Sequence, residues 1–86
     1  MNELKMFTRE EVAELFHAHV NTISMLREVG IIEGIKIGKN YMFPQTTISE
    51  FENNYLGLDC SNKLKAVESK KIVDEKLITH SKSIIL

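Results

Sequence analysis

Residues 6–56, MFTREEVAELFHAHVNTISMLREVGIIEGIKIGKNYMFPQTTISEFENNYL, decide the fold of this chain. They begin with two short segments of helical spacing that are separated by a turn of three residues. A segment with alternating apolar residues follows, and then a third helical segment. So short a turn makes two helices cross at a steep angle. Three helical segments and one alternating segment together predict a small, mostly helical α+β domain.

The first helix begins at a capping box. Thr8 is followed three residues later by Glu11, so each side chain can bond with the backbone N–H of the other residue. Phe7 and Val12 flank this cap with the spacing of a hydrophobic staple. The sequence therefore predicts a helix that starts directly after Thr8.

The second predicted helix spans residues 20–28 and ends at Gly30, which suits the left-handed backbone that closes many helices. Ile23 and Leu26 mark its buried face. We expect the opposite face to be exposed. That face carries Val20, Asn21, Ser24, Met25 and Glu28.

A β-hairpin and a third helix follow. Residues 35–37 alternate apolar and polar side chains, residues 38–40 suit a tight turn, and residues 41–43 form the return strand before Pro44. Thr46 or Thr47 then caps a helix that Gly57 closes. Its predicted core face consists of Ile48, Phe51, Tyr55 and Leu56. This order of elements predicts a winged helix-turn-helix, with the hairpin as the wing.

The predicted organisation places this domain at residues 1–57 and a C-terminal tail at residues 58–86. The tail has a helical composition, but its apolar residues do not hold one register. We favour a helix that docks on a partner or joins copies of the chain. Short strands at residues 72–73 and 77–79 are the alternative.

The composition is that of an ordinary soluble domain, with 43% hydrophobic and 27% charged residues. The 86 residues contain no apolar run long enough to span a membrane and no N-terminal pattern of a secretory signal. We therefore expect a cytoplasmic protein without a membrane partner.

Charge is unevenly divided along the chain. Residues 6–56 hold four basic and seven acidic side chains, for a net charge of −3, whereas residues 57–86 hold six lysines and four acidic side chains. Neutralisation of phosphates supplies most nucleic-acid affinity. Residues 6–56 should therefore bind DNA weakly as a monomer unless their cations gather in one place.

The sequence lacks a catalytic constellation, with no Gly-rich phosphate loop and no nucleophile motif. We therefore expect no enzymatic activity and no cofactor. His17 and His19 are two residues apart, a spacing that points helical side chains to different sides. No third ligand lies nearby in the sequence, so we expect no metal site.

The second helix and the hairpin carry side chains that suit DNA contacts. Asn21 can form paired hydrogen bonds with adenine, and a basic hairpin tip at Lys39 can enter a minor groove or bind phosphate. The same residues also suit a solvated helix face and a solvated hairpin. The predicted DNA-binding set is His19, Asn21, Thr22, Ser24, Met25, Arg27, Lys36, Lys39 and Asn40.

Residues 6–56 resemble the excisionase-type, MerR-like winged helix-turn-helix domains. The matching positions are Thr8, Glu10, Glu11, Ala13, Leu15, Thr22, Ile23, Gly30, Ile37, Gly38, Tyr41, Pro44 and residues 48–51. Domains of this family act as excisionases that bend attachment-site DNA for a recombinase, as small phage or plasmid regulators, and as recognition parts of packaging terminases. The resemblance implies a role in binding DNA.

We therefore expect a sequence-directed DNA-binding protein, either an excisionase or a transcriptional regulator of phage or plasmid type. Helix 20–28 would enter the major groove, and the hairpin at residues 36–41 would contact the flanking backbone or minor groove. Several copies would bind repeated or inverted sites cooperatively, as a homo-oligomer on double-stranded DNA. The alternative is a protein-interaction module on the same fold, which binds a repressor, recombinase or terminase partly through an exposed Val20 and Met25.

Overall fold

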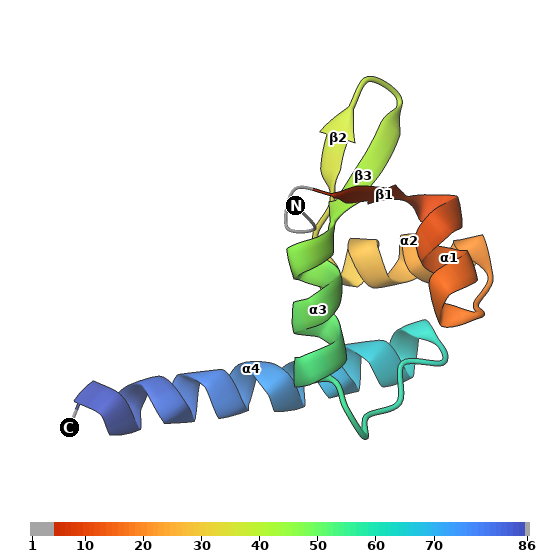
Figure 1. The fold of residues 1–86 in the computed structure, drawn as a ribbon. Helices are drawn as coiled ribbons and strands as arrows, with labels where there is room; N and C mark the ends of the chain where they lie inside the picture. Colours follow the sequence, from red (N-terminus) through yellow and green to blue (C-terminus); the bar gives the residue numbers. More distant parts are fainter. Residues whose placement is uncertain (1–4, 86) are drawn as a thin grey trace.

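The computed structural model describes residues 5–85, with side chains up to Leu77. Within that range the chain forms a mostly helical α+β structure with four helices and three strands (Figure 1). The elements in chain order are β1 (Met6–Thr8), α1 (Arg9–Phe16), α2 (Val20–Val29), β2 (Ile35–Ile37), β3 (Asn40–Pro44), α3 (Gln45–Asn54) and α4 (Lys63–Ile85).

The three strands form an antiparallel sheet in the order β1-β3-β2. The predicted hairpin is confirmed: β2 pairs with β3, and Lys36 lies directly opposite Tyr41. Gly38 has a φ of 65°, which supplies the left-handed backbone that the tight turn needs. The sequence did not predict β1, whose Phe7 lies opposite Phe43. The central strand is therefore β3, which connects the hairpin to the body of the protein.

The starts of α1 and α2 are fixed by side-chain caps. The Thr8 hydroxyl accepts a hydrogen bond from the Glu11 N–H at 3.1 Å, and the Thr8 N–H donates to Glu11 Oε1 at 2.8 Å, so the predicted capping box is confirmed. His19 caps α2, because its Nδ1 accepts from the Asn21 N–H at 3.1 Å. Gly30 ends α2 with a φ of 94°, as its position predicted.

The prediction for the ends of α3 was wrong. The helix begins at Gln45, directly after Pro44, so neither Thr46 nor Thr47 is its cap. Thr47 instead donates its hydroxyl hydrogen bond to the Pro44 carbonyl at 2.9 Å. The helix ends at Asn54, and Tyr55 is its C-cap, two residues before Gly57. The next residue, Leu56, is 86% exposed and does not belong to the core.

The core lies between the sheet and all four helices. Its buried apolar members are Val12, Ala13, Ile23, Leu26, Ile31, Ile32, Phe43, Ile48, Tyr55, Ala66 and Val73. Phe43 and Ile32 are almost completely shielded from solvent. Residues from β3, α2 and α4 thus share one core, which holds these elements in fixed relative positions.

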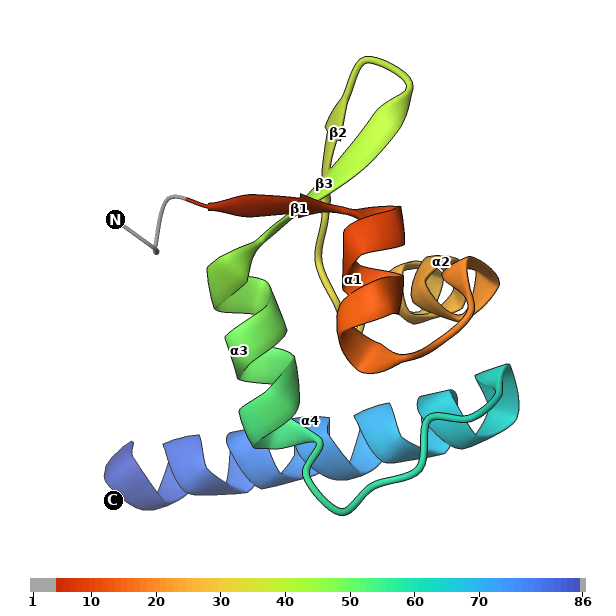
Figure 2. The ribbon, with the colours of Figure 1, turned by 45° about the vertical axis from the view of Figure 1, so that its right-hand side comes forward.

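The C-terminal tail contains one long helix, so the alternative of short strands was wrong. Helix α4 lies across α2 and the end of α3 and projects past them (Figures 1 and 2). It packs through Ala66, Ser69 and Val73, and the Ser69 hydroxyl donates to the Asp59 carbonyl at 2.7 Å. Among residues 5–85, no helix is both long and apolar enough to cross a membrane.

Candidate nucleic-acid interface

A groove of about 440 Å³ lies between the start of α1, helix α2 and strand β3. We name it the cationic groove. It is lined by Thr8, Arg9, Glu10, Ser24, Arg27, Glu28, Lys39, Asn40, Tyr41, Met42 and Phe43. Its charged side chains are three cations and two carboxylates, which leaves one net positive charge.

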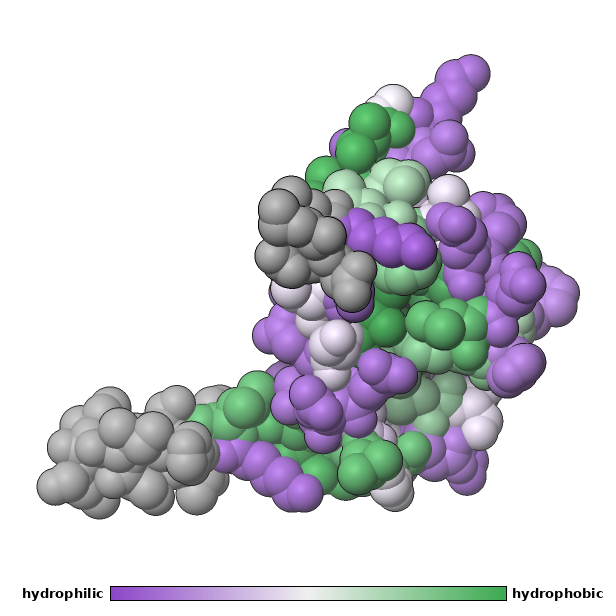
Figure 3. Space-filling view, in the orientation of Figure 1, coloured by the Kyte–Doolittle hydropathy of each residue, from purple (hydrophilic) through white to green (hydrophobic). Residues whose placement is uncertain are grey.

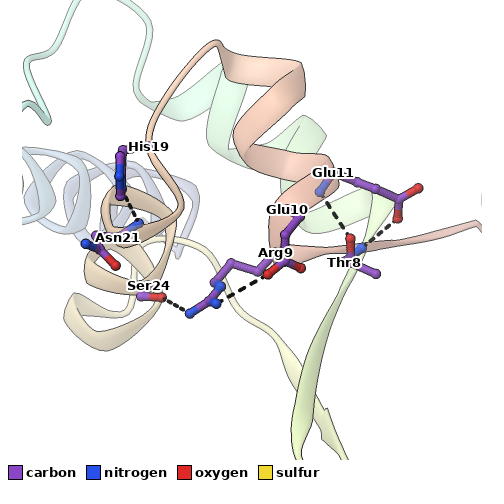
Figure 4. Close-up of polar contacts among 7 residues, drawn as sticks. All are labelled: Thr8, Arg9, Glu10, Glu11, His19, Asn21 and Ser24. Carbon is purple, nitrogen blue, oxygen red and sulfur yellow. Dashed lines mark hydrogen bonds and ion pairs between the residues drawn. The ribbon is translucent and has the colours of Figure 1, made fainter.

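Arg9 reaches from the start of α1 to the surface of α2. Its Nη1 donates to the Ser24 hydroxyl at 3.0 Å, and its Nη2 lies 3.3 Å from Glu10 Oε2 (Figure 4). The backbone N–H of Glu10, and then Arg9, hold the pKa of the Glu10 carboxyl below its usual value. These contacts place the Arg9 guanidinium beside the exposed side of α2.

Arg27 and Tyr41 connect the last turn of α2 to the sheet. The Arg27 guanidinium carbon lies 3.8 Å from the centroid of the Tyr41 ring. At that distance the guanidinium is attracted to the negative face of the ring. Lys36 shares this face of the sheet because it lies directly opposite Tyr41. The stack positions one cation at the junction of helix and hairpin.

Four residues of the predicted DNA-binding set come together in the cationic groove. They are Ser24, Arg27, Lys39 and Asn40. The other five lie outside its lining. Of these, His19 caps α2, Asn21 and Lys36 are exposed, and Thr22 and Met25 are half-buried.

The expectation that Val20 and Met25 are exposed was wrong. Both side chains are half-buried and pack against the core. The reason is that α2 contacts α1 along one side and α4 along another. A helix with neighbours on two sides buries a wider arc than the single stripe that Ile23 and Leu26 suggested.

Sequence reasoning gave no role to Arg9. The residue stands beside the cap of α1, and a neighbour in sequence, Glu10, is its simplest partner. Its place next to Ser24 depends on which side chains meet where α1 crosses α2, and the short turn between the helices does not specify them. The sequence offered one signal for Arg9, because basic side chains are scarce in residues 6–56. They are Arg9, Arg27, Lys36 and Lys39.

Most of the negative charge of residues 6–56 lies away from the cationic groove. Only Glu10 and Glu28 line it. The five remaining glutamates are exposed elsewhere, and they are Glu11, Glu14, Glu33, Glu50 and Glu52. The net charge of −3 therefore does not describe the surface between α2 and β3.

Among the residues that the structure describes, no group of three or more His, Cys, Asp or Glu side chains has the geometry to hold a metal ion. Comparison of the chain with protein-family models, with curated proteins and with solved structures finds no match.

Proposed function

We propose that this chain is a winged helix-turn-helix protein that binds double-stranded DNA in a sequence-directed manner, as an excisionase or a small transcriptional regulator. The observation that carries the proposal is the gathering of Arg9, Arg27 and Lys39 in one groove of an otherwise acidic domain. Cations concentrated along one side of a helix are the electrostatic footprint expected of a DNA-binding surface.

Helix α2 is the proposed recognition helix. Asn21 is exposed near its start, and an asparagine there can form two hydrogen bonds with an adenine edge in the major groove. Ser24 lies one turn further along, where Arg9 already donates to its hydroxyl. Arg9 and Ser24 would then contact phosphate together, which fixes the register of α2 on the duplex.

The β2–β3 hairpin is the proposed wing. Lys39 and Asn40 line the cationic groove from the hairpin side, and Lys36 is exposed on β2. A basic hairpin tip can bind the flanking backbone or enter the minor groove. The Arg27–Tyr41 stack connects the hairpin to the last turn of α2.

So few cations give a monomer only modest affinity. We therefore propose that several copies bind repeated or inverted sites cooperatively, with spacings that follow the helical repeat of DNA. A titration that shows tight, single-step binding by a monomer would contradict this part of the proposal.

The proposal is tested by selection of random duplexes, and of DNA that flanks its gene, on the purified protein at two salt concentrations. An enriched motif is expected. Affinity should fall with salt at a slope of about −0.9 for each neutralised phosphate, so about −2.7 for three cations in one copy. No enrichment at low salt would refute DNA recognition. An Asn21→Ala, Lys39→Ala double variant with unchanged activity in cells would favour the protein-interaction alternative.

A further inference from the structure

A second groove, of about 280 Å³, lies between the end of α2, helix α3 and helix α4. We name it the acidic groove. It is lined by Gly30, Ile31, Glu33, Thr47, Glu50, Phe51, Asn54, Tyr55, Lys70, Val73, Asp74 and Leu77. No residue lines both this groove and the cationic groove.

The acidic groove has an apolar floor. The rings of Phe51 and Tyr55 stack with centroids 5.2 Å apart, and Val73 of α4 is buried beside them. Leu77 is 52% exposed although it lines the groove. Figure 3 shows hydrophobic atoms along α4 below α3. Apolar side chains beneath a polar rim can receive an apolar side chain of a partner, as in the core and rim of protein interfaces.

The rim of this groove is negatively charged. Among the described side chains that line it, Glu33, Glu50 and Asp74 are acidic and Lys70 alone is basic. Lys70 already forms an ion pair within α4, because its Nζ lies 2.8 Å from Asp74 Oδ2. In the described part of the chain, neither Glu33 nor Glu50 forms a salt bridge. Burial, and then the charge of Asp74, raise the pKa of the Tyr55 phenol to about 12.

We propose that the acidic groove binds a basic peptide segment of a protein partner, one that carries a large apolar side chain. Lysine or arginine of the segment would pair with Glu33 and Glu50, and its apolar side chain would rest on Phe51 and Leu77. The sign of the charge selects this occupant. DNA phosphates would be repelled, and two copies joined groove to groove would place carboxylates against carboxylates.

The two grooves allow DNA and the partner to bind at the same time. Hairpin residues line the cationic groove, and α4 residues line the acidic groove. Figure 2 shows the hairpin and α4 on opposite sides of α2. A bound segment would therefore connect a second protein to DNA without displacing α2.

The test uses three labelled synthetic peptides of equal length, made of lysine and leucine, lysine and serine, or glutamate and leucine. Binding to the full chain is measured by fluorescence anisotropy, and the site is mapped by NMR shift changes. Only the lysine–leucine peptide should bind saturably, with shift changes around Glu33, Glu50 and Leu77. Equal binding of either other peptide, or no binding of the first, would overturn the proposal.

Two matched variants locate the contact. Glu33→Gln with Glu50→Gln removes two exposed charges from the rim, whereas Glu14→Gln with Glu52→Gln removes two exposed charges elsewhere. The rim variant should weaken the lysine–leucine peptide roughly fivefold, as expected for two exposed ion pairs, and the control should leave it unchanged. Leu77→Ser, at a side chain already half-exposed, should also weaken it.

Equal loss in the rim and control variants would show non-specific attraction and overturn the proposal. Sedimentation of the chain alone gives a separate check. If the chain self-associates with the same NMR shift changes, the occupant is a second copy and the proposed partner is wrong.

Discussion

The cationic groove and the acidic groove flank the same helix and carry opposite charge. Of the side chains that the structure describes, three cations and two carboxylates line the first groove, and three carboxylates and one cation line the second. The chain as a whole has a net charge of only −1. A total near zero therefore conceals two surfaces with opposite preferences, and the surface that meets a ligand decides the electrostatics of binding.

The two grooves also differ in how their charges are held. Arg9 is fixed by Ser24 and Glu10, and Arg27 is stacked on Tyr41. In the acidic groove, Glu33 and Glu50 are exposed, and the rigid part is the apolar floor. Arginines held by neighbouring side chains suit a ligand with a regular array of phosphates, whereas exposed carboxylates over an apolar floor suit a basic peptide.

The largest expected effect comes from removing the cations of the cationic groove. Replacement of Arg9, Arg27 and Lys39 by glutamine should weaken DNA binding on the order of a hundredfold at low salt, because three phosphate contacts are lost. The salt dependence should become shallower by almost three units of slope, at about −0.9 for each contact. Electrophoretic titration at several salt concentrations measures both quantities.

A matched control removes three positive charges from α4. Lys63, Lys65 and Lys71 are exposed there, and none of them lines the cationic groove. Their replacement by glutamine should change DNA affinity far less. If this variant loses as much affinity as the groove variant, the phosphates bind along α4 and the assignment of the two grooves fails.

Local signals in the sequence were enough for much of the fold. Thr8 with Glu11 predicted the start of α1, and Gly30 predicted the end of α2, because capping depends on residues that are close in the chain. The hairpin was predicted for the same reason, since its turn residues lie between its strands. The short strand β1 was missed because its only partner, β3, lies far along the chain.

The features that escaped prediction depend on packing between distant segments. Helix α4 buries Ala66 and Ser69, which are too small to form a visible hydrophobic stripe. Neither groove was predicted as a unit, although four of the eleven residues that line the cationic groove had been chosen as DNA contacts. Arg9 joined them only through the crossing of α1 and α2. Side-chain type can thus suggest contacts, but the tertiary fold decides which charges meet.

The pH dependence of stability tests the environment of the acidic groove. The pKa of Tyr55 is raised from 10.0 to about 12. Its contribution to stability should be complete below pH 10 and lost as the pH rises toward 12, because the unfolded chain ionises first. The loss is on the order of 2 kcal/mol, measured by urea unfolding at a series of pH values.

Tyr55→Phe is the control. It keeps the ring in the core but has no hydroxyl to ionise, so it should not show the loss of stability as the pH rises from 10 toward 12. The chain has only two tyrosines and no tryptophan, so absorbance titration of a Tyr41→Phe variant reports Tyr55 alone. Asp74→Asn should lower that pKa, since Asp74 is the second cause of its shift. If Tyr55 titrates with an ordinary tyrosine pKa in the Tyr41→Phe variant, the acidic groove is open to water around its phenol.

Loosening α4 should affect one groove and spare the other. Val73 is 5% exposed and anchors α4, which forms a wall of the acidic groove only. Val73→Ala should lower the free energy of unfolding by about 1.5 kcal/mol, through lost burial and a small cavity. Peptide binding should weaken. DNA binding, measured at temperatures where the variant is folded, should stay unchanged.

Val67→Ala makes the same chemical change on α4 at a half-buried position outside the core. It should lower stability by less than about 0.5 kcal/mol. Equal losses in the two variants would mean that α4 is not held through Val73.

The smallest expected effect concerns the stack that holds Arg27. Tyr41→Leu keeps an apolar side chain but removes the ring below the guanidinium, so DNA affinity should fall about threefold, as expected for a partly exposed cation–π contact. Tyr41→Phe retains the ring and should bind as the unaltered chain does. The decisive measurement repeats Tyr41→Leu in an Arg27→Gln background. If Tyr41 acts by positioning Arg27, its loss has no further effect there, whereas a persistent threefold loss would show that Tyr41 touches DNA itself.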